Sequence, residues 1–173
     1  NSTTNGNVSR ALLADPKGYE LNQLFVRYSG IPDTVLKLGR QRIILDNARF
    51  VGNVGWRMNE QTYDALNVVN TLIPKTTINY SYLSRVETPF YTSYKISGHA
   101  LTVSYAAFSW LTASAYGYLF DFDVNLPSRR DTQTYGIRAS GRAPICGVNL
   151  LYAAEYAHQY DYRDSPASVK APY

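Results

Sequence analysis

The chain has 173 residues, of which 45% are hydrophobic and only 17% are charged. This composition is too apolar for a disordered tail, and the length suits one domain with one core, covering residues 1–173. A net charge of +4, without a basic run beyond Arg129-Arg130, argues against nucleic-acid binding.

Several residue types that support chemistry are scarce. No stretch approaches the ~18 consecutive apolar residues of a membrane-spanning helix, which argues against a helical membrane protein. The single cysteine, Cys146, cannot form an internal disulfide, and the two histidines, His99 and His158, leave little material for a metal site or a histidine-based active site. We therefore expect no cofactor, no metal and no enzymatic activity; a hydrolase pairing His99 with a nearby serine is a distant alternative.

Alternation with a period of two divides most of the chain into short segments separated by turn residues. A polar segment, residues 1–14, comes first, and without an initiator Met we expect a mature form or a piece of a longer protein. The alternating segments are residues 20–29, 34–45, 56–70, 76–86, 99–108, 111–123, 132–141 and 148–158. Each is predicted to be a strand with two different faces.

One face of most segments is aliphatic or aromatic, and the other is small, polar or charged. The apolar faces include Leu24, Val26, Tyr28, Ile78, Tyr80, Tyr82, Leu101, Val103, Tyr105, Tyr135, Ile137, Leu150, Tyr152 and Tyr156. The opposite faces include Arg27, Asn79, Ser81, Arg85, Thr102, Ser104, Thr134, Arg138, Asn149 and Glu155. Residues 34–45 fit this pattern only with a bulge at Gly39, which would place Lys37, Arg40 and Arg42 on the polar face. Residues 56–70 do not fit, because Trp56, Glu60 and Asp64 would share one face.

Connections of two lengths separate the segments. Short connections at residues 30–33, 72–75, 109–110 and 141–147 alternate with long ones at 46–55, 87–98 and 124–131. This arrangement is typical of an antiparallel up-and-down transmembrane β-barrel, and Tyr28 and Trp110 fall next to short turns, where an aromatic belt would lie. A soluble β-sandwich that binds carbohydrate is the alternative, because its strands also alternate.

An ordered series of motifs resembles the alginate-export family of Gram-negative outer-membrane porins. The series comprises DPKG at 15–18, LKLGRQRI at 36–43, LDNARFVG at 45–52, GWRMNEQTYDA at 55–65, LFDFD at 119–123, QTYGIR at 133–138 and LYAAEYA at 151–157. The resemblance implies a large antiparallel barrel with a charged lumen, an integral outer-membrane location and passive passage of an anionic polysaccharide. Barrels of this family have about eighteen strands and this chain supplies about eight, so we expect a barrel segment unless the chain closes alone. The loop-like end at residues 165–173 also suggests truncation.

The candidate pathway residues are charged side chains expected to line the lumen: Arg27, Lys37, Arg40, Arg42, Arg57, Arg85, Arg138, Asp64 and Glu155. Arginine pairs bidentately with carboxylates and stays charged at any relevant pH, so these groups would favour anionic or polar solutes, including acidic polysaccharide. Alternatively, the same groups form a ladder of ion pairs that holds the wall together. Outer-membrane lipid is the other expected partner, and the sequence predicts neither the solute nor the oligomeric state.

Overall fold

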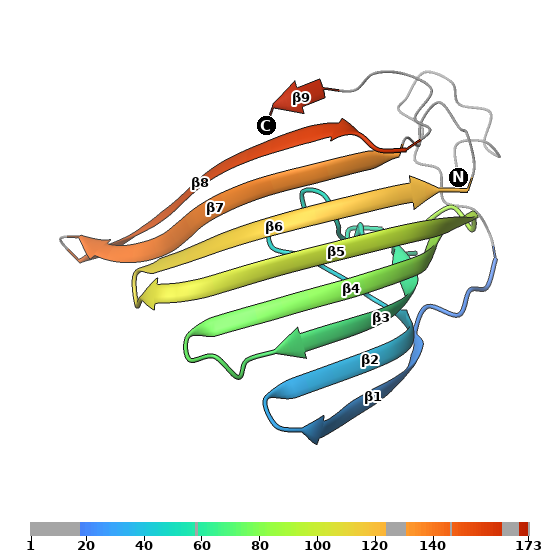
Figure 1. Ribbon diagram of the computed structural model, residues 1–173, viewed down its shortest axis with the longest axis horizontal. Helices are drawn as coiled ribbons and strands as arrows, with labels where there is room; N and C mark the ends of the chain where they lie inside the picture. The colour runs from blue at the N-terminus through green and yellow to red at the C-terminus, as the bar shows by residue number, and fades with distance from the viewer. Residues whose placement is uncertain (1–17, 58, 124–130, 146, 164–169, 173) are drawn as a thin grey trace.

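A computed structural model describes residues 18–57, 59–123, 131–145, 147–163 and 170–172. The strands are β1 (Leu24–Ile31), β2 (Thr34–Gln41), β3 (Thr62–Asn70), β4 (Thr76–Glu87), β5 (Ser93–Phe108), β6 (Leu111–Phe122), β7 (Thr132–Ile145), β8 (Val148–Asp161) and β9 (Lys170–Pro172). They form one antiparallel sheet in the order β1 to β9, so that each strand pairs with its neighbours in the chain (Figure 1). The predicted all-β, up-and-down architecture is confirmed. No helix in the described ranges is long and apolar enough to cross a membrane.

The sheet is open. β1 lies at one edge and β9 at the other, and β9 pairs only with His158, Gln159 and Tyr160 of β8. The described strands therefore do not close into a small barrel, and they form one sheet rather than the two layers of a β-sandwich. The expected loop at residues 165–173 needs a correction, because Lys170–Pro172 is a strand.

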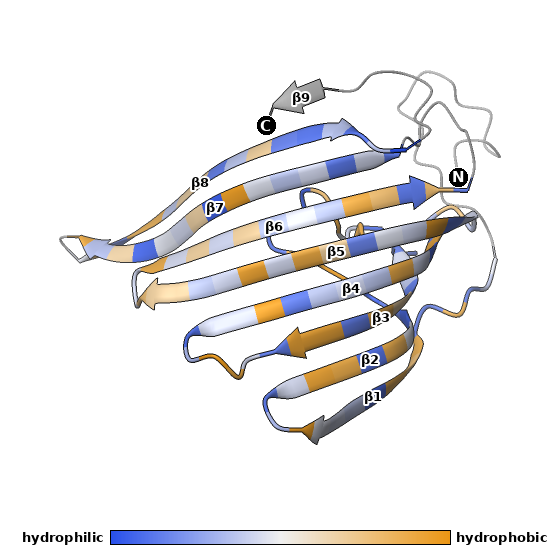
Figure 2. Ribbon diagram, viewed as in Figure 1, coloured by the Kyte–Doolittle hydropathy of each residue, from blue (hydrophilic) through white to orange (hydrophobic). Residues whose placement is uncertain are grey.

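Strand register separates the side chains into two faces. Residues directly opposite each other in an antiparallel pair share a face, so the pairs Arg27↔Lys37, Lys37↔Asn67 and Asn67↔Ser81 extend across one side. We call this side the polar face; across β1 to β8 it carries Arg27, Lys37, Asn67, Asn79, Ser81, Thr102, Ser104, Ser114, Thr134, Arg138 and Glu155. The apolar face carries Leu24, Val26, Leu36, Leu38, Leu66, Val68, Ile78, Leu101, Val103, Ile137 and Leu150. Hydrophilic and hydrophobic residues accordingly alternate along the strands (Figure 2).

Gly39 is not the site of a bulge. The register runs without a shift through Phe25↔Gly39 and Gly39↔Ala65, so Arg40 stays on the same face as Leu38. A bulge was predicted because Ile43 and Leu45 would otherwise face away from Leu36 and Leu38. The structure removes this conflict differently: β2 ends at Gln41, and Ile43 and Leu45 belong to the loop that follows. The registers instead shift beside Ser84, on both sides of β4.

Two further boundaries differ from expectation. β3 begins at Thr62, so Trp56 and Glu60, which fitted no strand face, lie in a loop. β5 begins at Ser93, which reduces the predicted long connection at 87–98 to residues 88–92. The remaining connections at that end of the sheet are long, namely residues 42–61, 123–131 and 162–169, whereas residues 32–33, 71–75, 109–110 and 146–147 connect the strands at the other end. We call these the loop end and the turn end.

The main hydrophobic cluster lies between the polar face and residues 42–61, which we call the folded loop. Figure 1 shows the folded loop behind β4 to β6. The cluster includes Ile43, Leu45 and Val51 of the loop and Tyr63, Ala65, Leu83, Val86, Ile96, Ala100, Tyr116, Tyr118 and Ala157 of the sheet. This is the loop-end half of the polar face, where Gly98 and Gly136 also leave room for neighbouring side chains.

Several predictions concern residues outside the described ranges: the polar segment 1–14, the DPKG motif through Lys17, Met58, the loop at 124–130, Cys146 and residues 165–169 and 173.

Candidate functional site: the polar face and the folded loop

Apolar side chains attach the folded loop to the sheet. Ile43, Leu45 and Val51 are 4%, 3% and 2% exposed. The ring of Phe50 lies 5.8 Å from that of Tyr116 and 6.0 Å from that of Tyr118. Burial of three aliphatic side chains contributes several kcal/mol, about 1.5–3 each, so the loop has a defined position over the sheet.

Charged groups attach the same loop to β7 and β8. Arg138 of β7 forms an ion pair with Asp46 at 2.5 Å. Glu155 of β8 accepts hydrogen bonds from Asn47 Nδ2 at 3.0 Å and from the Tyr116 hydroxyl at 2.5 Å, and it lies 3.5 Å from Arg49. Arg138 and Glu155, both predicted to line the lumen, lie on the polar face as expected, but their charges are compensated by the loop.

Glu60, near the end of the folded loop, binds Arg42 at the start of the loop. Its carboxylate accepts two hydrogen bonds from Arg42, at 2.6 and 2.5 Å, one from Asn53 at 2.6 Å and one from Asn22 at 2.8 Å. The Arg42 guanidinium is the main reason that the pKa of Glu60 falls from its ordinary 4.5 to about 2. Arg42 thus connects the start of the loop to its end, which is the structural role that the ion-pair-ladder alternative predicts.

Arg57 also lies in the folded loop rather than on a strand. Its guanidinium lies 4.3 Å from the ring centroid of Trp56 and 4.8 Å from that of Phe90, in the short connection between β4 and β5. Both are cation–π contacts. They fix Arg57 at the loop end of the sheet.

Arg40, Asp64 and Arg85 are not on the predicted face. Asp64 lies between Tyr63 and Ala65, which are buried under the folded loop, so its side chain projects from the apolar side. Arg40 donates to both carboxylate oxygens of Asp64, at 2.7 and 3.0 Å, and to Glu87 at 2.8 Å. Arg85 lies 3.6 Å from Asp64. The prediction that Arg40 shares the polar face with Lys37 is therefore wrong.

Glu20, which precedes β1, lies close to this cluster. Burial, followed by the charge of nearby Glu87, raises the pKa of its carboxyl group, and Arg40 opposes the shift. Arg40 also donates to the Leu21 carbonyl at 3.5 Å. The segment that leads into β1 thus lies against the charged cluster at the loop end of the apolar face.

Arg27 and Lys37 remain as uncompensated charges on the polar face. They are directly opposite each other on β1 and β2. Among the described residues neither forms an ion pair, and the Lys37 ammonium lies 5.1 Å from the ring centroid of Phe25. Like charges in directly opposed positions repel each other, so this pair favours an anion between or beside its members.

The apolar face is exposed and edged by aromatic side chains. At the turn end, Phe108 and Trp110 stack with their ring centroids 5.0 Å apart. Towards the loop end, the Tyr80 hydroxyl lies 2.8 Å from His99 Nδ1, and the ring of Tyr82 lies 5.2 Å from that of His99. His158 stacks on Tyr160 at 4.1 Å on the same face. No hydrogen bond within the described residues joins either histidine to a serine.

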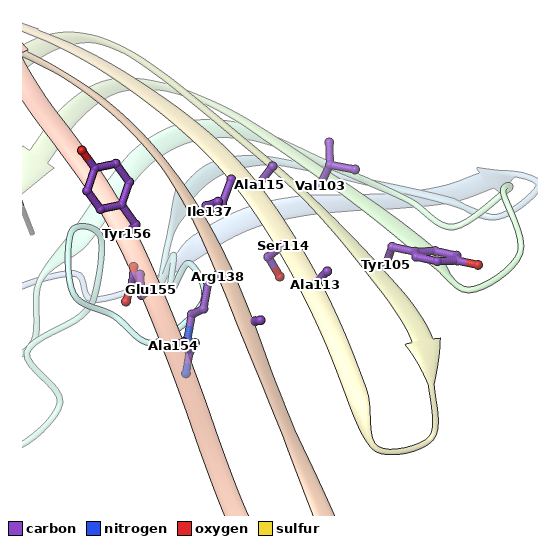
Figure 3. A pocket seen from close by; sticks show the side chains of 11 residues that line it. Val103, Tyr105, Ala113, Ser114, Ala115, Ile137, Arg138, Ala154, Glu155 and Tyr156 are labelled. Atoms are coloured by element: carbon purple, nitrogen blue, oxygen red, sulfur yellow. The ribbon is translucent and has the colours of Figure 1, made fainter.

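A shallow depression of about 640 Å³ crosses the apolar face of β5 to β8. Its floor is formed by small residues, Ala113, Ala115, Ala139 and Ala154, and its sides include Val103, Tyr105, Ile137 and Tyr156. Figure 3 shows Val103 and Ile137 projecting from one side of the sheet and Ser114 and Arg138 from the other. Apolar and polar side chains of neighbouring strands therefore lie on opposite sides of the sheet in this region.

The sequence did not point to Asp46, Asn47 and Arg49 as the residues that attach the folded loop. A signal was present, because the predicted connection at 46–55 contains the adjacent apolar residues Phe50 and Val51, and because Ile43 and Leu45 fitted the preceding predicted strand only with a bulge. An apolar run within a long loop indicates that the loop packs on something.

Comparison of the chain with protein-family models, with curated proteins and with solved structures gave no match.

Proposed function

We propose that the chain forms part of the wall of an outer-membrane β-barrel through which anionic or polar solutes diffuse passively. The observation that carries this proposal is the continuous apolar face on eight strands, opposite a polar face whose loop-end half is covered by the folded loop. A sheet that faces lipid on one side and an aqueous lumen on the other has this distribution of side chains.

The height of the apolar band supports the proposal. The stretch of β5 from His99 to Phe108 connects the aromatic residues near the loop end to those at the turn end. At about 3.3 Å per residue and a tilt of about 40°, this stretch rises roughly 23 Å, close to the ~25 Å band of outer-membrane barrels. Because open edges are not tolerated in lipid, further strands complete the wall.

Selectivity in this proposal comes from Arg27 and Lys37 rather than from the whole basic set. Arg42 and Arg138 are neutralised by carboxylates and Arg40 lies on the apolar face, so these three contribute little net field to the lumen. The folded loop occupies space beside the loop-end half of the polar face. The motif series favours an acidic polysaccharide, similar to alginate, as the solute. No covalent chemistry is proposed.

Conductance in planar bilayers tests the proposal, on the complete gene product. We expect discrete current steps with a preference for anions, and we expect Arg27→Gln/Lys37→Gln to move the anion-to-cation permeability ratio towards unity. Arg85→Gln/Lys95→Gln is the matched control, since it removes an equivalent cross-strand pair from the apolar face. A well-folded protein that never conducts would refute the channel, and an unchanged ratio in Arg27→Gln/Lys37→Gln would refute this source of selectivity.

A further inference from the structure

A second pair of directly opposed cations lies on the apolar face, close to the loop end. Arg85 of β4 is opposite Lys95 of β5, and the shift in register beside Ser84 produces this pairing. Closer to the turn end, three residues away along β4 and four along β5, the aromatic residues begin with Tyr82 opposite His99. The pair therefore lies just beyond the edge of the apolar band.

Positive charge at this pair is only partly compensated. Asp64 lies 3.6 Å from Arg85, but both of its carboxylate oxygens already accept hydrogen bonds from Arg40. The Arg85 guanidinium donates to Ser93 Oγ at 2.9 Å. Lys95 is exposed and forms no ion pair within the described part of the chain. Arg85 therefore shares the Asp64 carboxylate with Arg40.

A hollow of about 350 Å³ adjoins Lys95. It is lined by Tyr82, Ser84, Lys95, Ile96, Ser97, Asp121 and Asp123. Its hydroxyl groups can donate to a phosphate oxygen, and its carboxylates can accept from the hydroxyl or ammonium groups that accompany a phosphate in a lipid headgroup. Asp121 is also paired with Arg163, so the acidic side of the hollow is partly neutralised.

We propose that Arg85 and Lys95 bind the phosphate of a phospholipid headgroup, with the rest of the headgroup in the adjoining hollow. This site rests on the proposed function, since the apolar face contacts lipid only in a membrane-spanning wall. The acyl chains of the bound lipid follow the apolar face from Tyr82 and His99 towards Leu101. The ligand is a component of the surrounding membrane and is separate from any solute in the lumen.

Native mass spectrometry of the detergent-folded, complete protein tests the site. The probes are phosphatidylglycerol and monoglucosyl diacylglycerol with the same acyl chains, which differ in whether the headgroup carries a phosphate. We expect retention of phosphatidylglycerol only, weakened roughly thirtyfold in Arg85→Gln/Lys95→Gln, at about fivefold for each cation removed. Lys95→Gln alone keeps the test valid if loss of Arg85 disturbs folding, because Lys95 is exposed.

The pair on the polar face provides the matched control. Arg27→Gln/Lys37→Gln removes the same two charges and should retain phosphatidylglycerol like the unaltered protein. Equal retention of the two lipids, or unchanged retention in Arg85→Gln/Lys95→Gln, would overturn the proposal. Displacement of the lipid by an equal concentration of inorganic phosphate would show a site for free phosphate instead. Current steps that persist in Arg85→Gln/Lys95→Gln distinguish failure of this site from failure of the channel.

Discussion

Protonation or removal of the Glu60 carboxylate should release the folded loop. The pKa of this group is lowered from 4.5 to about 2, chiefly by Arg42. A carboxylate with a depressed pKa stabilises the folded form above the pKa of the unfolded chain, and this contribution is lost as the pH falls towards the folded pKa. The window is therefore about pH 4.5 down to about pH 2.

The shift corresponds to at most about 3 kcal/mol, and solvent around the half-exposed Arg42 reduces it to about 2 kcal/mol. Glu60→Gln keeps the size of the side chain but removes the charge that Arg42, Asn53 and Asn22 contact. We expect the loop to open about thirtyfold more often at neutral pH, and we expect the unaltered protein to approach the same behaviour near pH 2.

Hydrogen exchange followed by mass spectrometry measures this opening. The amides of Leu45 and Gln61 are suitable reporters, because they donate to the carbonyls of Val51 and Asn53 within the loop at 3.1 and 2.7 Å. Glu87→Gln is the control, since Glu87 pairs with Arg40 outside the folded loop. Equal protection of the loop in Glu60→Gln and in the unaltered protein, with the same dependence on pH, would refute the reasoning.

Three further predictions concern the faces and the register. Val103→Arg should reduce the free energy of folding into vesicles by about 2–4 kcal/mol, whereas Ser104→Arg, on the polar face, should reduce it much less. Equal reductions would contradict the assignment of faces. Brominated lipids should quench the fluorescence of Trp110, which is the remaining tryptophan in Trp56→Phe. They should not quench Trp56, the remaining tryptophan in Trp110→Phe. Quenching in both variants would place the folded loop in lipid. Gly39→Ala should destabilise the protein by about 1–3 kcal/mol, because φ is +126° and the added carbon would lie 2.5 Å from the Leu24 carbonyl; an unchanged melting temperature would show that the strand relaxes.

The strands and most of their faces could be predicted because they depend on local alternation. On β4 the predicted separation of Ile78 and Tyr80 from Asn79 and Ser81 is confirmed by the register. The same pattern failed at Trp56. Residues of the loop before β3 alternate by chance, so the predicted strand began at Trp56 instead of at Thr62. Alternation reports which side chains share a face, but it does not show where hydrogen-bonded pairing starts.

The charged residues were harder to place because polarity alone does not assign a face. Arg40 was moved to the polar face by a bulge at Gly39, on the assumption that an arginine avoids the apolar side. Near a strand end this assumption fails, because Asp64 and Glu87 supply partners beyond the apolar band. The contacts of Asp46 and Asn47 with β7 and β8 join segments about a hundred residues apart, and no local pattern reports them.

The meander has a consequence for the order of assembly. Every strand pairs with its neighbours in sequence, so the sheet can grow by successive hairpins without waiting for distant segments. The folded loop is different: it leaves β2 early in the chain, yet Arg138 and Glu155, which hold it, belong to strands made much later. Its apolar side chains therefore lack part of their binding surface until β7 and β8 have joined the sheet. Closure of the loop over the polar face then marks the completion of this part of the sheet.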